Sequence, residues 1–268
     1  MANHYCLVIP HYRHVQPLLE MCAKLVDLTL TVDLPEPLPD ALPNSLPIYV
    51  VDDASPAADF DALAEGLTAY PQIELIKRPG NGGKGAAMMT GLNRAAADGY
   101  SHAISMDADG QHNIDDMSAL IEQAELHPQA IIAGRPVFGD DIPASRLYGR
   151  MLTNTLVKAQ TASSMIKDAM CGFRIYPLTE IRPLFSRIGY RTRMEFDVEL
   201  LVRAHWAGID IHSVDTRVVY PEHGASHFNM FADNVRLVAM HIILIVGGIL
   251  RLPEKLVPRL KRTRAVQS

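Results

Sequence analysis

Short apolar runs alternate along this chain with longer stretches of helical spacing, and this alternation limits the possible folds more than any other feature. It predicts an α/β protein with a mostly parallel central sheet and helices on both faces. The strands expected in the first half are Tyr5–Ile9, Ile48–Val51, Ile73–Ile76, His102–Met106 and Ala130–Ala133. The helices expected between them are Val15–Leu28, Asp59–Ala69, Ala86–Ala97 and Ile114–Leu126.

The second half, from Ser145 to Tyr220, mixes helices with short strands. The strands expected here are Gly172–Tyr176, Ile211–Val214 and Arg217–Tyr220. Five prolines between residues 35 and 47 predict a stiff surface connection before the second strand, because proline fits neither a helix interior nor a central strand. We interpret this connection as an insertion in one large domain. A chain of 268 residues with 48% hydrophobic residues can form such a domain with an appended element.

The appended element is the most apolar segment, Leu237–Leu250, in which His241 is the polar exception. Fourteen helical residues span about 21 Å, which is less than the ~30 Å hydrocarbon core of a bilayer. The sequence therefore predicts a C-terminal apolar helix that lies at a membrane surface rather than crossing it. A core helix packed against the sheet is the alternative.

The charges of the chain are unevenly distributed. From Arg251 to Ser268 there are six basic residues and one acidic residue, so this tail carries +5. Since the whole chain carries −5, the remainder carries −10. An acidic body argues against nucleic-acid binding, whereas a basic tail suits an anionic membrane surface.

The cysteines and the N-terminus indicate the compartment. Cys6, Cys22 and Cys171 are widely spaced and form no CxxC pair, which is typical of buried thiols in a reducing environment. The first residues lack the basic region and long apolar stretch of a secretory signal. We therefore expect a cytoplasmic protein, peripheral at the cytoplasmic face of a membrane.

The strongest sign of chemistry is Asp107-Ala108-Asp109-Gly110-Gln111-His112, directly after an expected strand. Ligands of parallel sheets bind beyond the carboxyl ends of the strands. Two carboxylates separated by one residue can share Mg²⁺ or Mn²⁺ with phosphate oxygens, and such an ion neutralises a nucleoside diphosphate leaving group. The alternative is a pair of turn-forming aspartates. Polar clusters after the other strands favour the metal site.

Four motifs follow one another along the chain, each at or after an expected strand: IPHYRH, VVDDAS, NGGKGAA and MDADGQH. This series resembles the family 2 glycosyltransferases, which have the Rossmann-like GT-A fold. Gly134-Arg135 and the CGFR segment, Cys171–Arg174, add a similarity to the dolichol- and polyprenyl-phosphate sugar transferases. The resemblance covers Tyr5 to Phe228. It implies transfer of a sugar from a nucleotide-sugar donor to a polyprenyl phosphate or another lipid-linked acceptor.

The resemblance also implies roles for individual residues, with the Tyr12 ring stacking on the base. The nucleotide-sugar contacts expected are Pro10, Tyr12, Asp52, Asp53, Asn81, Gly83, Lys84, Asp107 and Arg135. The metal ligands expected are Asp107, Asp109, Gln111 and His227. His227 could instead be protonated and bind phosphate. An ordinary flexible turn is the alternative for the glycine-rich segment, which is not a P-loop because Gly85 follows Lys84.

Two kinds of acceptor remain open, and they need different residues. A hydroxyl of a glycan or lipid precursor needs a carboxylate base, for which the resemblance points to Asp197 and Glu195. The alternative for these two is a structural role, as negative charges at a helix N-terminus. A phosphate is already anionic and needs cations, for which Arg146, Arg150 and Arg174 are the candidates.

Two other functions are disfavoured. A sugar-1-phosphate nucleotidyltransferase would carry a glycine-rich signature after the first strand, where PHYRH has no glycine. A catalytically silent, membrane-bound nucleotide-sugar-binding protein is disfavoured by the intact DxDxQ sequence. The sequence thus favours an inverting, metal-dependent transferase. We expect the catalytic domain in residues 1–228 and a membrane-surface anchor in residues 229–268.

Overall fold

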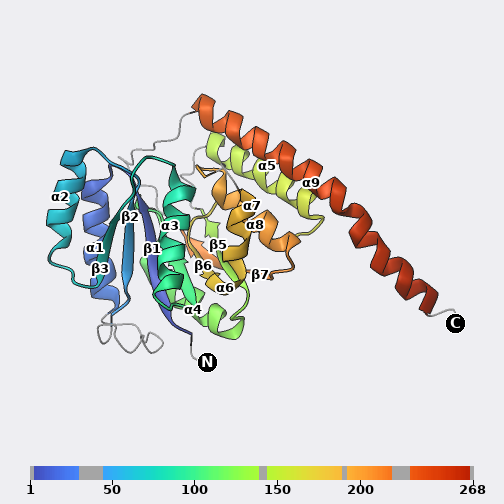
Figure 1. The fold of residues 1–268 in the computed structure, drawn as a ribbon, viewed down its shortest axis with the longest axis horizontal. Helices are drawn as coiled ribbons and strands as arrows, with labels where there is room; N and C mark the ends of the chain where they lie inside the picture. The colour runs from blue at the N-terminus through green and yellow to red at the C-terminus, as the bar shows by residue number, and fades with distance from the viewer. Residues whose placement is uncertain (1–2, 30–44, 139–143, 189–191, 219–229, 266–268) are drawn as a thin grey trace.

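A computed structural model describes residues 3–29, 45–138, 144–188, 192–218 and 230–265 of the chain (Figure 1). The strands are β1 (Tyr5–His11), β2 (Ile48–Asp52), β3 (Ile73–Lys77), β4 (His102–Ser105), β5 (Ile131–Val137), β6 (Arg174–Pro177) and β7 (Ile211–Arg217). The α-helices are α1 (Val15–Thr29), α2 (Ala57–Leu67), α3 (Lys84–Ala97), α4 (Met117–Leu126), α5 (Ala144–Thr161), α6 (Leu178–Ile181), α7 (Phe185–Ile188), α8 (Phe196–Trp206) and α9 (Met230–Ala265). Two 3₁₀ turns, η1 (Ile114–Asp116) and η2 (Arg182–Leu184), precede α4 and α7.

The described strands form one sheet in the order β3-β2-β1-β4-β6-β5-β7. Strand β1 pairs in parallel with β2 and β4, β2 with β3, and β5 with β7, whereas β6 runs antiparallel between β4 and β5. The prediction of a mostly parallel sheet is confirmed. The carboxyl ends of β1, β2, β3 and β4 therefore meet at one edge of the sheet, where the predicted polar motifs follow them.

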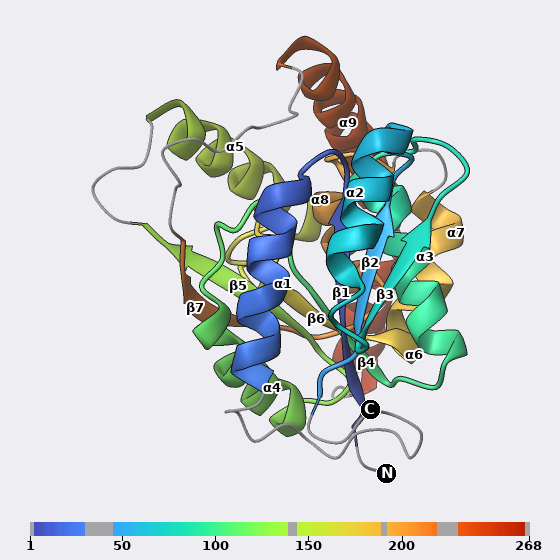
Figure 2. The same ribbon diagram turned by 90° about the vertical axis from the view of Figure 1, so that its left-hand side faces the viewer.

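Helices cover both faces of the sheet (Figure 2). Successive side chains of a strand point to opposite faces, and each face packs against its helices in a separate hydrophobic core. On β1, Leu7 and Ile9 pack in the core that includes residues of α1, α2 and α4. Cys6 and Val8 point to the opposite face, into the core that includes residues of α3, α5, α8 and α9. All three cysteines are buried and free, as the sequence predicts.

The predicted strands near Ile211 differ from the observed one. Ile211–Val214 and the start of Arg217–Tyr220 form the single strand β7, and Tyr220 lies outside the described residues. Strand β7 lies at the edge of the sheet, so polar side chains such as Asp215 are exposed on it. A search for apolar runs therefore does not find its full length.

Helix α9 is much longer than the expected segment Leu237–Leu250. Within it, the 19 residues Asp233–Arg251 are apolar enough and long enough to cross a membrane by length and composition, at about 28 Å. The predicted length was too short because the helix continues through flanking polar residues. The share of this window that is buried, 22%, also argues against the alternative of a core helix.

Candidate active site

The glycine-rich segment between β3 and α3 lies against the residues that lead into α8. The Thr192 hydroxyl donates a hydrogen bond to the carbonyl oxygen of Gly82 (2.8 Å). A Cβ at Gly85, in the first turn of α3, would overlap with the side chain of Phe196 at the start of α8. Glycine thus permits the close approach of the two helices. Their N-termini meet beside the carboxyl edge of the sheet.

Asp53 holds the same segment from the other side. The backbone N–H groups of Gly82 and Gly83 donate to its two carboxylate oxygens (3.0 and 2.6 Å), and the Arg78 guanidinium also donates to it. The Asn81 amide donates to the carbonyl oxygen of Asp53 (3.1 Å). The structure therefore brings together three residues predicted to contact the nucleotide, Asp53, Asn81 and Gly83. The hydrogen bonds among these residues fix the conformation of the glycine-rich loop. Their contact with a nucleotide stays a prediction.

Asp52 lies deeper, and its side chain is fully buried. One carboxylate oxygen lies 2.9 Å from His11 Nδ1, and the other accepts a hydrogen bond from the Ser55 N–H (2.9 Å). Burial raises the pKa of Asp52, but the hydrogen bonds from His11 and Ser55 outweigh it, so that the pKa is lower than usual. Asp52 thus supports the turn after β2, rather than offering an open face to a nucleotide.

The predicted base pocket lies at the end of β1. Pro10 is buried within the strand, opposite Val51 of β2. Tyr12 follows the strand and is half-buried, with the Arg13 guanidinium carbon 5.3 Å from its ring centroid. Tyr12 therefore stands at the correct edge of the sheet for the stacking role, which stays a prediction.

Lys84, the first residue of α3, joins the loop to two other segments. Its Nζ lies 2.6 Å from Asp107 Oδ1 and 2.6 Å from Asp197 Oδ2. Burial lowers the pKa of Lys84, but the charges of Asp107 and Asp197 outweigh burial and raise it far above its usual value. The side chain is thus a permanent ammonium between the predicted metal site and the predicted base. Asp197 is 113 residues away in sequence, and no local motif predicts this contact.

The two aspartates of the predicted metal site have opposite electrostatic surroundings. Burial raises the pKa of Asp107, but Lys84 and His112 outweigh it and hold the pKa far below its usual range. Burial and the charge of Asp107 raise the pKa of Asp109. The site therefore has negative charge that Lys84 does not balance, which a divalent cation would neutralise.

The donor set at this site fits Mg²⁺ or Mn²⁺. Asp107 and Asp109 offer carboxylate oxygens, and the Gln111 side chain offers an amide oxygen. Within the described residues, no three His, Cys, Asp or Glu side chains gather around one point. Mg²⁺ is commonly held by one or two carboxylates and completed by substrate phosphates and water, so two carboxylates suffice. His227, the further predicted ligand, lies outside the described residues.

Gly172 of the CGFR segment makes room for the metal-site carboxylate. A Cβ on Gly172 would overlap with the carboxylate of Asp107, so this close approach requires glycine. The sequence resemblance identifies the segment but not this role. The backbone of Gly172 therefore forms one wall of the site.

Arg174, a predicted acceptor contact, is fully buried behind this wall. Its guanidinium donates to the carbonyl oxygens of Asp197 and Ala169 (both 2.8 Å) and to the Tyr176 hydroxyl (3.1 Å). This geometry gives Arg174 a structural role at the start of α8, with no open face toward an acceptor phosphate.

The other two arginines predicted to bind the acceptor lie on α5. Arg150 Nη1 lies 2.7 Å from Asp168 Oδ2, and its side chain is 19% exposed. The side chain of Arg146 lies outside the described residues. Both contacts with an acceptor stay predictions.

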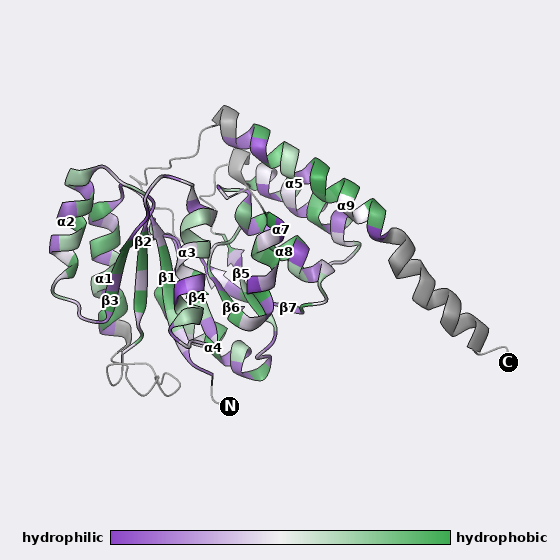
Figure 3. Cartoon of the chain, viewed as in Figure 1, coloured by the Kyte–Doolittle hydropathy of each residue, from purple (hydrophilic) through white to green (hydrophobic). Residues whose placement is uncertain are grey.

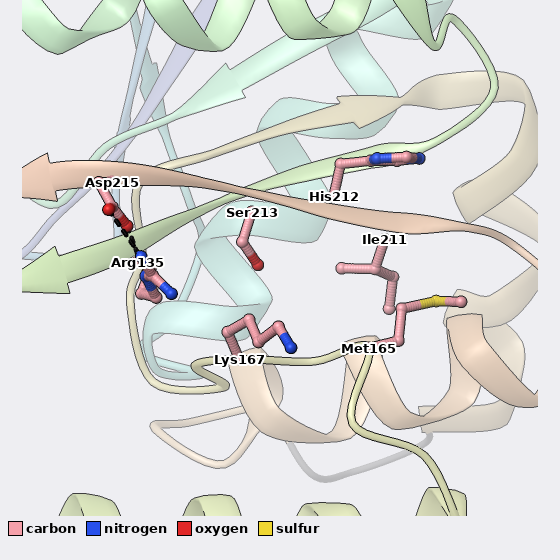
Figure 4. Close-up of a pocket in the computed structure, with 7 residues that line it drawn as sticks. All are labelled: Arg135, Met165, Lys167, Ile211, His212, Ser213 and Asp215. Carbon is pink, nitrogen blue, oxygen red and sulfur yellow. Dashed lines mark hydrogen bonds and ion pairs between the residues drawn. The ribbon is translucent and has the colours of Figure 1, made fainter.

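Arg135 lies on β5 and is exposed, with its guanidinium paired to Asp215 of β7 (Nη2 to Oδ2, 2.6 Å). The pair borders a groove of about 460 Å³ (Figure 4). The groove is lined by Arg135, Met165, Lys167, Ile211, His212, Ser213 and Asp215. None of the Lys84, Asp107 and Asp197 side chains lines it. The structure therefore does not group Arg135 with Lys84, Asp107 and Asp197. Its contact with the nucleotide-sugar donor stays a prediction.

Residues 6–183 match the family model described as Glycosyl transferase family 2. The chain belongs to this family. It is therefore a glycosyltransferase of the hexosyltransferase type that the motifs predict, and the DxDxQ and NGGKG motifs lie within the matched region.

Similar glycosyltransferases include lipid-phosphate enzymes. A polyprenol monophosphomannose synthase of Mycolicibacterium smegmatis is 28% identical, over 70% of this chain and 72% of the relative. An undecaprenyl-phosphate mannosyltransferase of Micrococcus luteus is 27% identical over 82% and 85%. A dolichyl-phosphate β-glucosyltransferase of Dictyostelium discoideum is 26% identical, over 71% of this chain but 59% of the relative. The resemblance to this subgroup is confirmed.

Solved structures share the fold of this glycosyltransferase. Glucosyl-3-phosphoglycerate synthase of Mycobacterium tuberculosis, in complex with phosphoglyceric acid, matches with a TM-score of 0.62 at 13% identity, over 91% of this chain and 80% of that one. The same enzyme with Mn²⁺, UDP and phosphoglyceric acid matches at 0.58 and 14% identity, over 92% and 78%. These matches confirm the GT-A fold.

The two carboxylates predicted as bases in this glycosyltransferase differ in their surroundings. Asp197 is paired with the Lys84 ammonium, which also contacts Asp107. Glu195 is buried, at 2% exposure, and its Oε2 has no hydrogen-bond partner in the described part of the chain. The structure thus groups Asp197, but not Glu195, with Lys84 and Asp107 of the predicted metal site.

Proposed function

We propose that this glycosyltransferase is metal-dependent and inverting, and that it moves a sugar from a nucleotide-sugar to a polyprenyl phosphate or another lipid-linked acceptor. The observation that carries the proposal is the Lys84 ammonium between Asp107 and Asp197. It gathers the metal-site carboxylate, the glycine-rich loop and the start of α8 at the carboxyl edge of the sheet.

The metal ion would be held by Asp107, Asp109 and Gln111. When bound, Mg²⁺ or Mn²⁺ supplies positive charge to the diphosphate leaving group. Lys84 holds Asp107 in place through its ammonium, and Gly172 lets the carboxylate lie against the backbone. The structural relative with Mn²⁺ and UDP supports a divalent ion in this fold.

In the transfer itself, an acceptor oxygen attacks the anomeric carbon from the face opposite the diphosphate. The new C–O bond forms as the bond to the diphosphate breaks, and the configuration inverts. The residues contribute by positioning the reactants and by balancing charge.

A phosphate acceptor fits this site better than a hydroxyl. Asp197 already has Lys84 as an ion-pair partner, and its carbonyl oxygen is held by Arg174. A hydroxyl acceptor would require Asp197 or Glu195 as a base, whereas a phosphate oxygen needs none. The names of the relatives, which include polyprenol, undecaprenyl and dolichyl phosphates, support the same choice.

The acceptor is tested with a polyprenyl phosphate and the free polyprenol of the same chain length. The purified protein in detergent receives Mn²⁺, a labelled nucleotide-sugar and one of the two lipids. We expect labelled product with the phosphate alone, released from the lipid by mild acid. Product with the free alcohol alone would overturn the phosphate assignment.

We also propose the cytoplasmic face of a membrane as the site of action. Residues 1–228 would form the catalytic domain, and residues 229–268 the anchor. The apolar window in α9 and the basic residues after it support this division.

A further inference from the structure

We propose that α5 and α9 together form one membrane-docking face, which rests on the bilayer surface without α9 crossing it. The inference builds on the proposed lipid acceptor and adds a second helix, α5, to the contact.

One side of α9 is fixed to the catalytic domain. Met240 and Leu244 are fully buried in the core that also contains residues of α8. His241, between them, is 7% exposed, and the Gln160 amide of α5 donates to its Nδ1 (2.9 Å) and its carbonyl oxygen (3.2 Å). Further along, the Arg251 guanidinium carbon lies 4.9 Å from the Trp206 ring centroid.

These contacts lie in the middle and at the end of the apolar window. A membrane-spanning α9 would have to leave the domain, which would expose the Met240 and Leu244 pockets and separate Gln160 from His241. Breaking a buried hydrogen bond leaves polar groups without partners, which is unfavourable. The structure therefore favours a helix that stays on the domain and meets the membrane with its free side.

The free side of α9 is apolar. Val238, Ile242, Val246 and Ile249 are between 51% and 59% exposed, and they recur at the spacing of one helical face. Leu250 beside them is 72% exposed. Figure 3 shows the hydrophobic residues that recur along this part of α9.

Helix α5 contacts α9 near its C-terminal end, through Gln160, and its first half presents a second apolar row. Tyr148, Met151 and Leu152 are 68%, 56% and 63% exposed, and Leu147 next to them is 36% exposed. Several large apolar side chains exposed together on one helix face are typical of a binding surface. The two rows on neighbouring helices define the docking face.

The charge next to this face favours lipid over a second copy of the chain. From Arg251 onward the chain carries six basic residues against one acidic residue. An apolar helix face followed by basic residues is typical of binding to anionic bilayers. A second copy on the same face would bring two basic tails together, and like charges repel.

The docking face is also connected to the active site. On α5, the Asn154 side chain accepts from the Ala169 N–H (3.0 Å) and donates to Asp168 Oδ2 (3.2 Å). Asp168 in turn accepts from the Cys171 N–H (2.8 Å), next to the Gly172 wall of the metal site. A bilayer in contact with α5 would therefore lie beside the segment that positions Asp107.

The proposal is tested by flotation of the full-length protein with vesicles of phosphatidylcholine containing phosphatidylglycerol, without donor or acceptor. The variant Met151→Glu/Leu152→Glu places charges on the α5 row. The matched control is Leu126→Glu at the end of α4, because Leu126 is 64% exposed, close to the 63% of Leu152. Circular dichroism and the melting temperature check that each variant is folded.

We expect the α5 variant to bind vesicles about tenfold more weakly than wild type, and the control to bind as wild type does. We also expect alkaline carbonate to release the wild-type protein from vesicles, as it releases surface-bound proteins. Unchanged flotation of the α5 variant would overturn the role of α5. Resistance to carbonate would show that α9 crosses the bilayer, and a wild-type dimer that the α5 charges dissociate would assign the face to a second copy.

The failure of this proposal is distinguishable from the failure of the proposed function. Flotation uses no sugar donor, so it does not depend on catalysis. A protein that does not float but transfers sugar to a short-chain polyprenyl phosphate in detergent would lack the docking face and keep the proposed activity.

Discussion

Single residues in this site act mainly by balancing charge between distant segments. Asp107 is close to Lys84, whereas burial and the charge of Asp107 raise the pKa of Asp109. A raised carboxyl pKa in the folded state stabilises the protein at low pH, and this contribution is lost as the pH rises through the folded-state pKa. Without metal, Asp109 is therefore unfavourable for folding at neutral pH. A divalent cation bound at the proposed site would offset this cost.

Replacing Asp109 with Asn should have opposite effects on catalysis and on stability in the absence of metal. We expect sugar transfer to fall by about a thousandfold or more, because one oxygen ligand loses its charge. In EDTA at neutral pH we expect the melting temperature to stay equal or rise, because the repulsion with Asp107 is removed. The checks are initial rates and thermal melting, with Asp115→Asn, at an exposed carboxylate on η1, as control. Wild-type turnover in the Asp109 variant would contradict the metal-site assignment.

Replacing Lys84 tests the charge bridge. We expect Lys84→Met to lower kcat by about a hundredfold or more, since Asp107 and Asp197 would be left without their shared cation. Lys84→Arg should restore part of the rate, because it keeps the charge. Steady-state kinetics of both variants measure this, with Lys77→Met at an exposed lysine on β3 as control. A Lys84→Met enzyme with unchanged kcat and a raised KM would show that Lys84 only contacts the donor.

Secondary-structure elements contribute by their close approach at one edge of the sheet. The N-termini of α3 and α8 meet there because Gly85 has no side chain to separate them. Strand β6, antiparallel between β4 and β5, places the Gly172 segment beside the end of β4. The position of Asp107, in the predicted metal site, thus depends on contacts between elements that are far apart in sequence.

Alanine at Gly85 should weaken the fold through this contact. We expect a loss of about 1–3 kcal/mol in the free energy of unfolding, because the new Cβ would overlap with Phe196. The matched control is Gly149→Ala in α5, where a Cβ meets nothing within 4 Å. It should stabilise the protein by about 0.5–1 kcal/mol, as glycine is unfavourable within a helix. Urea denaturation measures both, and equal stability of the two variants would contradict the close contact of α3 and α8.

The whole molecule combines a charged site at one sheet edge with an apolar face on α5 and α9. This arrangement suits a reaction between a water-soluble donor and a lipid-linked acceptor. The proposed function also predicts that donor binding is linked to metal binding, because a diphosphate would complete the proposed metal site.

Thermal melting with UDP-, GDP- and dTDP-sugars tests this link. We expect one nucleotide class to raise the melting temperature with Mn²⁺ but not with EDTA. At a concentration a hundredfold above Kd, the rise should be about 5 °C or more. Equal stabilisation in EDTA would contradict metal-dependent donor binding, and the class that stabilises identifies the base of the donor.

The sequence by itself determined the α/β class, the positions of most strands along the chain, the family and the DxDxQ position. These features depend on local periodicity and on motifs of a few neighbouring residues, which are visible without the fold. The sequence also located Lys84 and Asp197 as candidates, although it assigned them to separate tasks.

Only the tertiary structure decided what these residues contact. Lys84 meets Asp197 across 113 residues, and Arg174 is buried behind the site, because the sheet order brings distant segments to one edge. Helix length alone also did not show which side of α9 is free. That side is set by Met240, His241 and Leu244 packing into the domain, and packing partners are a property of the folded chain.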